Sequence, residues 1–236
     1  MDTVVVIPAR DEEALIGACL ESVRIAAPNA PIVVVADSCV DRTAEIARSF
    51  ASVTVVEVDA AGVGEARRLG VFAALSQVET PLERLWIANT DADSVVPANW
   101  ISLQERLAES GADAVVGTVR PRASDLSADE LARWHRSHDD GQAIGHVHGA
   151  NLGVRASVYL AAGGFESVLE HEDNDLVHRI RSAGFTISAT DQCEVVTSGR
   201  RFGRTPGGYA AHLRSTLRHD SSDLEASELV TTNRKE

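Results

Sequence analysis

The chain has 236 residues, of which 44% are apolar, so it can bury a core as one large domain or as two tightly joined halves. Its formal net charge of −13 argues against a general nucleic-acid binder, because such a protein needs a basic face to displace counterions from phosphates. No segment reaches the roughly 18 apolar residues of a membrane span, and a strand-like run begins by Thr3, so we expect a cytoplasmic protein with neither a signal peptide nor an integral membrane segment.

The first ninety residues alternate between strand-like and helix-like segments. Strands are predicted at 3–9, 31–37, 53–59 and 84–90, where β-branched and apolar residues run without clean alternation, as in strands covered on both faces. Helical patterns follow Asp11 and Asp41, and each aspartate is a predicted N-cap. This order predicts a parallel sheet with right-handed crossovers.

The second half of the chain is less regular. We expect a helix after Pro97, a strand at 113–119, and a helix that opens at Ser127, because Ser127 and Glu130 have the spacing of a capping box.

Two more elements and a tail complete the prediction. A helix is expected from Glu172 to a closing Gly184, and a strand at 185–191. From about Asp220 the sequence is polar and patternless, which predicts a flexible tail. No repeat or linker separates the halves, so we expect them to share one sheet.

Three cysteines, Cys19, Cys39 and Cys193, are widely spaced. Their odd number and spacing favour reduced thiols over a disulfide framework or a zinc site. We assign them no role.

Carboxylates recur where the predicted strands end. In open parallel sheets, ligands bind at the carboxyl ends of the strands. The first strand runs into "ARDEE", the second into "DSCVDRT" and the fourth into "DADS". These segments predict a ligand site at one edge of the sheet.

Asp91 and Asp93 stand one residue apart after the fourth predicted strand. On an extended backbone, residues two apart share a face, so we expect the two carboxylates side by side. Their repulsion raises one pKa or requires a cation, and Mg²⁺ or Mn²⁺ prefers such oxygen ligands. A helix cap explains this pair equally well, so the two residues alone leave both interpretations open.

Five segments in a fixed order carry a family resemblance: VVVIPARDEEALIGACLESV, VVVADSCVDRTAEIA, ANTDADSVVPANWI, GANLGVRASVYLAAGGF and EHEDNDLVHRIRSAG. Together they resemble glycosyltransferase family 2, from about Val4 to Gly208. The resemblance implies an α/β fold of the GT-A type, with a Rossmann-like, mostly parallel central sheet and helices on both faces. It also implies a single domain over 1–219, with a nucleotide-binding half (1–93) and an acceptor half (94–219), before a tail at 220–236.

The resemblance implies an enzyme that moves a sugar from a nucleotide-sugar donor, most commonly a UDP- or GDP-sugar, to an acceptor hydroxyl with inversion. Asp93 most directly holds Mn²⁺ or Mg²⁺ on the diphosphate, with Asp91 beside it. Asp173 is the general base, and Asp175 is the competing candidate. Taken alone, Glu172 and Asp173 are typical of an ordinary helix N-terminus.

The resemblance also places residues around the donor and the acceptor. The implied nucleotide- and donor-binding residues are Pro8, Arg10, Glu12, Asp37, Arg67, Arg68, Asp91, Ala92, Arg200 and Arg201. The implied sugar and acceptor pocket comprises His148, Gly149, Asn151 and Glu172, with Arg155 near the reaction centre. The acceptor is a small molecule, a lipid-linked molecule or a glycan.

Other interpretations stay open for several of these residues. Arg67 and Arg68 fit a solvated helix face equally well. Arg200, Arg201 and Arg204 lie among glycines, which predicts a mobile loop that closes over the phosphates or a plain surface loop.

Two histidines allow two interpretations as well. His146 and His148 share a face if the chain is extended, as metal ligands do, but a partly exposed structural histidine explains His146 better.

Departures from the family pattern also inform the prediction. There is no Q-x-x-R-W motif, which favours a single transfer over processive synthesis. The family's commoner D-D-G-S is replaced by Ala36, Asp37, Ser38 and Cys39, which leaves the nucleotide base open.

Competing classes explain the sequence less well. A nucleotidyltransferase lacks the expected glycine-rich loop after the first strand, and an NAD-binding domain lacks G-x-G-x-x-G there. A degenerate sugar-nucleotide or carbohydrate-binding protein is disfavoured because the D-x-D pair and Asp173 are both retained.

Overall fold

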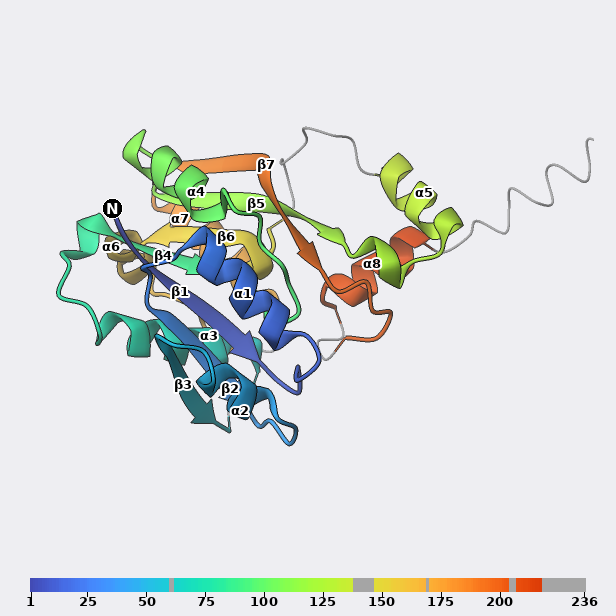
Figure 1. Ribbon diagram of the computed structural model, residues 1–236. Coiled ribbons are helices and arrows are strands. Elements are labelled where there is room, and N and C mark those ends of the chain that lie inside the picture. Colours follow the sequence, from blue (N-terminus) through green and yellow to red (C-terminus); the bar gives the residue numbers. More distant parts are fainter. Residues whose placement is uncertain (60–61, 138–146, 169, 204–206, 218–236) are drawn as a thin grey trace, which may run out of the picture.

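The computed structural model describes residues 1–59, 62–137, 147–168, 170–203 and 207–217. Within them, one seven-stranded sheet runs through both halves of the chain (Figure 1). Its strands are β1 (Asp2–Ala9), β2 (Ile32–Asp37), β3 (Val53–Val58), β4 (Leu85–Asn89), β5 (Ala114–Pro121), β6 (Leu152–Arg155) and β7 (Ile187–Thr197), in the spatial order β3-β2-β1-β4-β6-β5-β7. Only β6 pairs antiparallel with its neighbours, β4 and β5. The predicted mostly parallel α/β sheet, shared by both halves, is confirmed.

Helices cover both faces of the sheet, as predicted. One apolar core packs β1, β2 and β4 against α1 (Ile16–Ala26), α2 (Thr43–Arg48) and α4 (Trp100–Glu109). The core on the opposite face includes α3 (Val63–Leu75), α6 (Ala156–Ala161) and α7 (Glu172–Ser182). A smaller cluster joins α5 (Ala128–Ser137) to α8 (Tyr209–Leu217), which lie together beyond the ends of β5 and β7 (Figure 1). Short 3₁₀ turns lie at Leu82–Arg84, Ala123–Asp125 and Gly149–Asn151.

The two predicted aspartate N-caps are wrong in different ways. Asp11 adopts a left-handed backbone with φ 47°, and α1 begins only at Ile16. At α2 the N-cap residue is Arg42, one position after Asp41. Asp41 still supports this helix start, because its Oδ1 accepts the Thr43 N–H at 2.9 Å.

The other two helix signals are confirmed. Ser127 and Glu130 form the reciprocal capping box, since the Ser127 N–H donates to Glu130 Oε2 at 2.9 Å and the Glu130 N–H donates to Ser127 Oγ at 3.3 Å. Gly184 lies just past α7 with φ 83°, and its N–H donates to the Arg181 carbonyl at 3.0 Å. The left-handed φ explains why glycine ends this helix.

Two strand predictions need correction. β3 is an edge strand of the sheet, and its side chains pack against the cores on both faces but stay partly or fully exposed, so it is less covered than predicted. The last strand does not stop at residue 191 but continues to Thr197, because its second half pairs with the end of β5 after an irregularity between Gly117 and Val119. The predicted tail from Asp220 lies outside the described residues. Among the helices that are described, none has the length and apolar character needed to cross a membrane.

Candidate functional site

A cleft of about 540 Å³ opens at the edge of the sheet where β1, β2, β4 and β7 end. It brings together residues from the motifs at the ends of all four strands. The predicted site residues that line it are Pro8, Arg10, Glu12, Asp37, Asp91, Ala92, Asp93 and Arg200. The prediction of a ligand site at this edge therefore corresponds to a real cavity.

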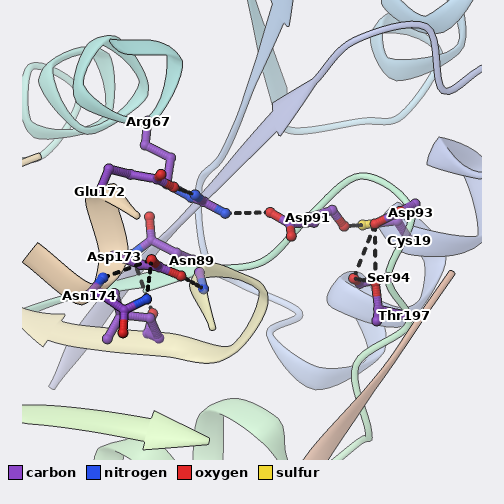
Figure 2. A network of polar contacts seen from close by, with 12 residues as sticks. Cys19, Arg67, Asn89, Asp91, Asp93, Ser94, Glu172, Asp173, Asn174 and Thr197 are labelled. Atoms are coloured by element: carbon purple, nitrogen blue, oxygen red, sulfur yellow. Dashed lines mark hydrogen bonds and ion pairs between the residues drawn. The ribbon is translucent and has the colours of Figure 1, made fainter. Parts of the chain in front are cut away.

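Asp91 and Asp93 lie on a turn beyond β4. The strand ends at Asn89, and the Ser94 N–H donates to the Asp91 carbonyl at 3.0 Å. The prediction that the two aspartates continue an extended strand is therefore wrong. Asp91 pairs instead with Arg67, and Asp93 belongs to a separate group of contacts (Figure 2).

Asp93 is enclosed by hydroxyl groups and one guanidinium. Its Oδ1 accepts the Thr197 hydroxyl at 3.3 Å, and the Ser94 hydroxyl donates to Thr197 Oγ1 at 3.0 Å. Its Oδ2 pairs with Arg200 at 2.5 Å. Burial raises the pKa of the Asp93 carboxyl, the negative Asp91 adds to this rise, and Arg200 opposes it.

Asp91 experiences the same conflict. Burial raises the pKa of its carboxyl, the Arg67 guanidinium lowers it, and the negative Glu172 raises it again. The rise prevails, because burial together with the neighbouring carboxylates outweighs the effect of Arg67.

Arg67 lies behind the cleft wall, not in it. Only 3% of its side chain is exposed, and it pairs with both Asp91 and Glu172. It is therefore not on a solvated helix face. Arg68, the next residue, is exposed and pairs with Glu65 on its own helix at 2.5 Å, so the structure does not bring it to the cleft.

Arg200 follows β7 and reaches into the cleft. Its guanidinium pairs with Glu12 Oε1 at 2.7 Å and with Asp93, while its side chain stays 33% exposed. Arg201 instead pairs with Glu130 of α5 and does not line the cleft. Arg204 and His146 lie outside the described residues.

Asp173 stands in the first turn of α7, held by backbone groups on two sides. Its Oδ2 accepts the Gly149 N–H at 2.7 Å, and its Oδ1 accepts the Asn174 N–H at 2.7 Å (Figure 2). Asp175 pairs with Arg179 at 2.9 Å and is 43% exposed. The two candidate bases therefore differ in surroundings, and Asp173 is the one bound to the predicted pocket segment.

Asn151 does not reach the predicted acceptor pocket. It is fully buried, and its Oδ1 accepts the Trp100 indole N–H at 2.9 Å. Its Nδ2 donates to the carbonyls of Thr118 and Cys193, both at 2.9 Å. Its amide joins α4, β5 and β7 in the core, which explains the burial.

His148 and Arg155 point to different parts of the molecule. His148 packs edge-on against Tyr209, with the ring centroids 5.8 Å apart, and Tyr209 lines the cleft. Arg155 lies at the opposite end of β6, where it donates to the Glu83 and Ala112 carbonyls at 2.7 and 3.0 Å. The expectation that Arg155 lies near the reaction centre is therefore wrong.

Sequence reasoning missed several residues that line the cleft, including Val63, Thr197, Ser198 and Tyr209. The β-branched run before Thr197 signalled a longer last strand. Tyr209 carries little signal, because α8 follows a glycine-rich stretch.

A second group of potential metal ligands lies beside the cleft. One ligand atom from each of Asp11, Cys39 and Asp41 lies within 4.8 Å of the others. The Asp11 carboxylate accepts the Val40 N–H, and the Asp41 carboxylate accepts the Thr43 N–H. These hydrogen bonds shape the loops after β1 and β2, and this structural role is enough to explain why the residues lie together.

The sheet order and the cleft at the carboxyl edge define the GT-A fold of glycosyltransferases. Solved structures agree: one of TarS of S. aureus in complex with UDP-GlcNAc matches with a TM-score of 0.66 at 13% identity, covering 92% of this chain and 70% of that one. A mannosyltransferase of Pyrobaculum calidifontis in complex with GDP-Man and Mn²⁺ matches with a TM-score of 0.64 at 18% identity, covering 99% and 81%. These likenesses show the fold.

The profile of the family described as "Glycosyl transferase family 2" matches residues 4–161, and the chain belongs to this family. The succinoglycan biosynthesis protein ExoA of Rhizobium meliloti (strain 1021) is 26% identical over 211 residues. That match covers 82% of this chain and 62% of ExoA, so the chain spans less than two thirds of its curated relative.

Proposed function

We propose that the protein transfers a sugar from a nucleotide-sugar donor to a hydroxyl group of an acceptor. The convergence of four strand ends on one cleft carries this proposal: Arg10 follows β1, Asp37 ends β2, Asp93 follows β4 and Arg200 follows β7. Such an edge suits a nucleoside diphosphate, which offers polar groups and a charged diphosphate. Proteins of the same fold were solved with UDP-GlcNAc and GDP-Man, and we take a UDP- or GDP-sugar as the donor.

The donor atoms of the cleft suit a hard divalent cation. Arg67 and Arg200 each pair with two carboxylates, so the two clusters hold four carboxylates against two guanidiniums. Burial is the largest cause of the raised pKa values of Asp91 and Asp93, and neighbouring carboxylates add to both rises. We infer that Asp93, with Asp91 beside it, would hold Mn²⁺ or Mg²⁺. When bound, the ion neutralises charge on the leaving diphosphate.

The chain's own residues would hold the rest of the donor. Pro8, Arg10 and Asp37 line the side of the cleft formed by β1 and β2, where the nucleoside would bind. Arg200 is half-exposed and can exchange a carboxylate for a phosphate oxygen. Arginine suits this role because its planar fork matches phosphate geometry.

Asp173 is the proposed base. The Gly149 and Asn174 N–H groups fix the orientation of its carboxylate. From there it would accept the proton of the acceptor hydroxyl while that oxygen attacks the anomeric carbon, which inverts the configuration. We propose a single transfer per encounter.

A panel of donors tests the function directly. UDP-, GDP-, CDP- and dTDP-sugars, each with and without Mn²⁺, are compared for their effect on the melting temperature. One donor should stabilise the protein, and more strongly with Mn²⁺. Transfer of that sugar to small, lipid-linked and glycan acceptors is then followed, and the anomeric coupling in the product NMR spectrum distinguishes inversion from retention.

The base is tested with two neighbouring variants. Asp173→Asn should lower kcat by about 10²- to 10⁴-fold, because proton removal is lost. Asp175→Asn, two residues along the same helix, should retain most activity because Asp175 pairs with Arg179. Equal losses in both variants would refute the assignment, and donor binding without any transfer by the wild type would indicate a binding protein.

A further inference from the structure

Three segments that are distant in the sequence meet around one guanidinium behind the cleft. Arg67 of α3 pairs through Nη1 with Glu172 and through Nη2 with Asp91 Oδ1 at 2.5 Å (Figure 2). The Arg67 and Glu172 side chains are only 3% and 4% exposed, so water has little access to that pair, whereas Asp91 is 35% exposed. One side chain therefore joins the turn that carries the D-x-D aspartates to the first residue of α7.

The backbone that holds Asp173 lies against the same guanidinium. A Cβ atom at Gly149 would lie 2.3 Å from Arg67 Nη2, so this peptide touches the arginine directly. The Gly149 N–H is the group that donates to Asp173 Oδ2 at 2.7 Å. Arg67 thus contacts both the residue before Asp173, which is Glu172, and the peptide that binds Asp173.

Helix α3 also approaches α7 closely. At Gly64, one turn before Arg67, a Cβ atom would lie 2.4 Å from the Glu166 carbonyl oxygen and 3.1 Å from Glu172 Cβ. The arginine is therefore presented from a backbone that is itself packed against the start of α7.

We propose that Arg67 is a positioning residue that sets the placement of Asp173 relative to Asp91. The proposal rests on the proposed function for the roles of these two aspartates. A guanidinium is planar and its donors have a fixed geometry, so the two carboxylates it pairs are held at a separation that its own bonds define. The catalytic base must lie at a fixed distance from the bound donor, because a misplacement of about 1 Å can cost about 100-fold in rate.

The kinetic test replaces the planar guanidinium of Arg67 with the ammonium group of lysine, which keeps the positive charge but loses the fixed donor geometry. Arg67→Lys should lower kcat by about 10-fold or more, while the KM for the donor changes by less than about 3-fold. The matched control is Arg179→Lys, because Arg179 lies within α7, pairs with Asp175 at 2.9 Å and, like Arg67, does not line the cleft, but it does not contact Asp91 or Glu172. This control should keep both constants within about 2-fold. An Arg67→Lys enzyme with wild-type kcat would overturn the proposal.

A second measurement does not depend on activity. Amide hydrogen exchange of the metal-free protein is followed at Ser94, Gly149 and Asp175, whose N–H groups donate to Asp91, Asp173 and His171. In Arg67→Lys all three should exchange about 10-fold faster, with the amides of β1 and β2 unchanged. Wild-type rates at all three, or a uniform increase across the sheet, would overturn the proposal. If the wild type transfers no sugar, the proposed function fails, and these rates alone then decide the role of Arg67.

Discussion

The D-x-D pair is shared between two arginines in different surroundings. Arg67 projects from helix α3 and is 3% exposed, whereas Arg200 projects from the loop after β7 and is 33% exposed. Each guanidinium lies between two carboxylates, one of which is a D-x-D aspartate. The two clusters therefore have the same charge but differ in burial and in the element that carries the arginine.

This difference separates a fixed support from an exchangeable counterion. A buried guanidinium cannot leave its carboxylates without stranding charge in a medium that solvates it poorly. The Arg200 guanidinium is 33% exposed, so water or a phosphate can reach it, whereas its partners Glu12 and Asp93 are only 7% and 11% exposed. We therefore expect Arg200 to change partners when a diphosphate binds and Arg67 to stay in place.

The largest effect should come from removing the buried arginine. Arg67→Met should lower the free energy of unfolding by about 3–5 kcal/mol, because Glu172 and Asp91 then lose their shared cation. Arg200→Met should cost less, about 1–2 kcal/mol, because its guanidinium is partly solvated even though Glu12 and Asp93 lose their cation. Urea denaturation measures both, and adding Glu172→Met to Arg67→Met should recover part of the loss. Similar losses for the two arginines would contradict the comparison.

A smaller effect should follow from crowding the buried cluster. Gly149→Ala places a methyl group 2.3 Å from Arg67 Nη2 and should cost about 1–3 kcal/mol. Gly17→Ala in α1 is the matched control, since a Cβ atom there meets nothing within 4 Å. It should be neutral or stabilise the protein by up to about 1 kcal/mol. The melting temperatures of the two variants give the comparison. If Gly149→Ala is as stable as Gly17→Ala, the contacts around Arg67 rearrange at little cost, which would contradict the prediction.

The exposed arginine should matter more for binding than for stability. Arg200→Ala should weaken nucleoside diphosphate binding about 10-fold, because a charged hydrogen bond to phosphate is lost. The structure predicts a smaller loss for Arg201→Ala, whose guanidinium pairs with Glu130. Calorimetric titration with UDP or GDP in Mn²⁺ measures both. Equal losses would support the sequence-based view that both arginines close over the donor.

The smallest expected effect on stability concerns the aspartate beside Arg200. Asp93→Asn should abolish metal-dependent nucleotide binding yet stabilise the metal-free protein by up to about 1 kcal/mol, because it removes a buried charge.

The pH dependence of that gain follows from the pKa of Asp93, which the fold raises above 3.8. A raised carboxyl pKa means that the wild type binds this proton more tightly when folded, so its contribution to stability is full below the ordinary pKa and is lost as the pH rises through the raised value. The advantage of asparagine should therefore be greatest near neutral pH and shrink as the solution is acidified. Melting temperatures of both proteins between pH 5 and 8 give the difference, and a gain that grows on acidification would contradict the prediction.

Much of the fold and the cleft could be predicted from local patterns. β-Branched runs marked the strands, and the rule that ligands bind at the carboxyl edge brought Arg10, Asp37 and Asp93 to one place, whereas Arg200 was assigned to the donor through the family resemblance. These inferences succeeded because strand direction and chain order determine which residues share that edge.

Side-chain burial could not be predicted in the same way. Arg67 is buried because carboxylates 24 and 105 residues away neutralise it, and no local pattern signals such partners. Asn151 looked like a pocket residue, but the Trp100 indole and two strand carbonyls satisfy it in the core. Both outcomes depend on tertiary partners, which motif resemblance does not specify.

Strand β6 runs against both of its neighbours, and this reversal has a consequence for how the family can diversify. The chain leaves β5 after Pro121 at the cleft edge and re-enters the sheet from that same edge at Leu152, beside the strand it left. Residues 122–137 thus belong to a connection that begins and ends on adjacent strands. Such a connection can change in length or sequence without shifting the register of any strand, as long as Gly149 and Asn151 keep their contacts, so the surroundings of the cleft can evolve while the donor side stays unchanged.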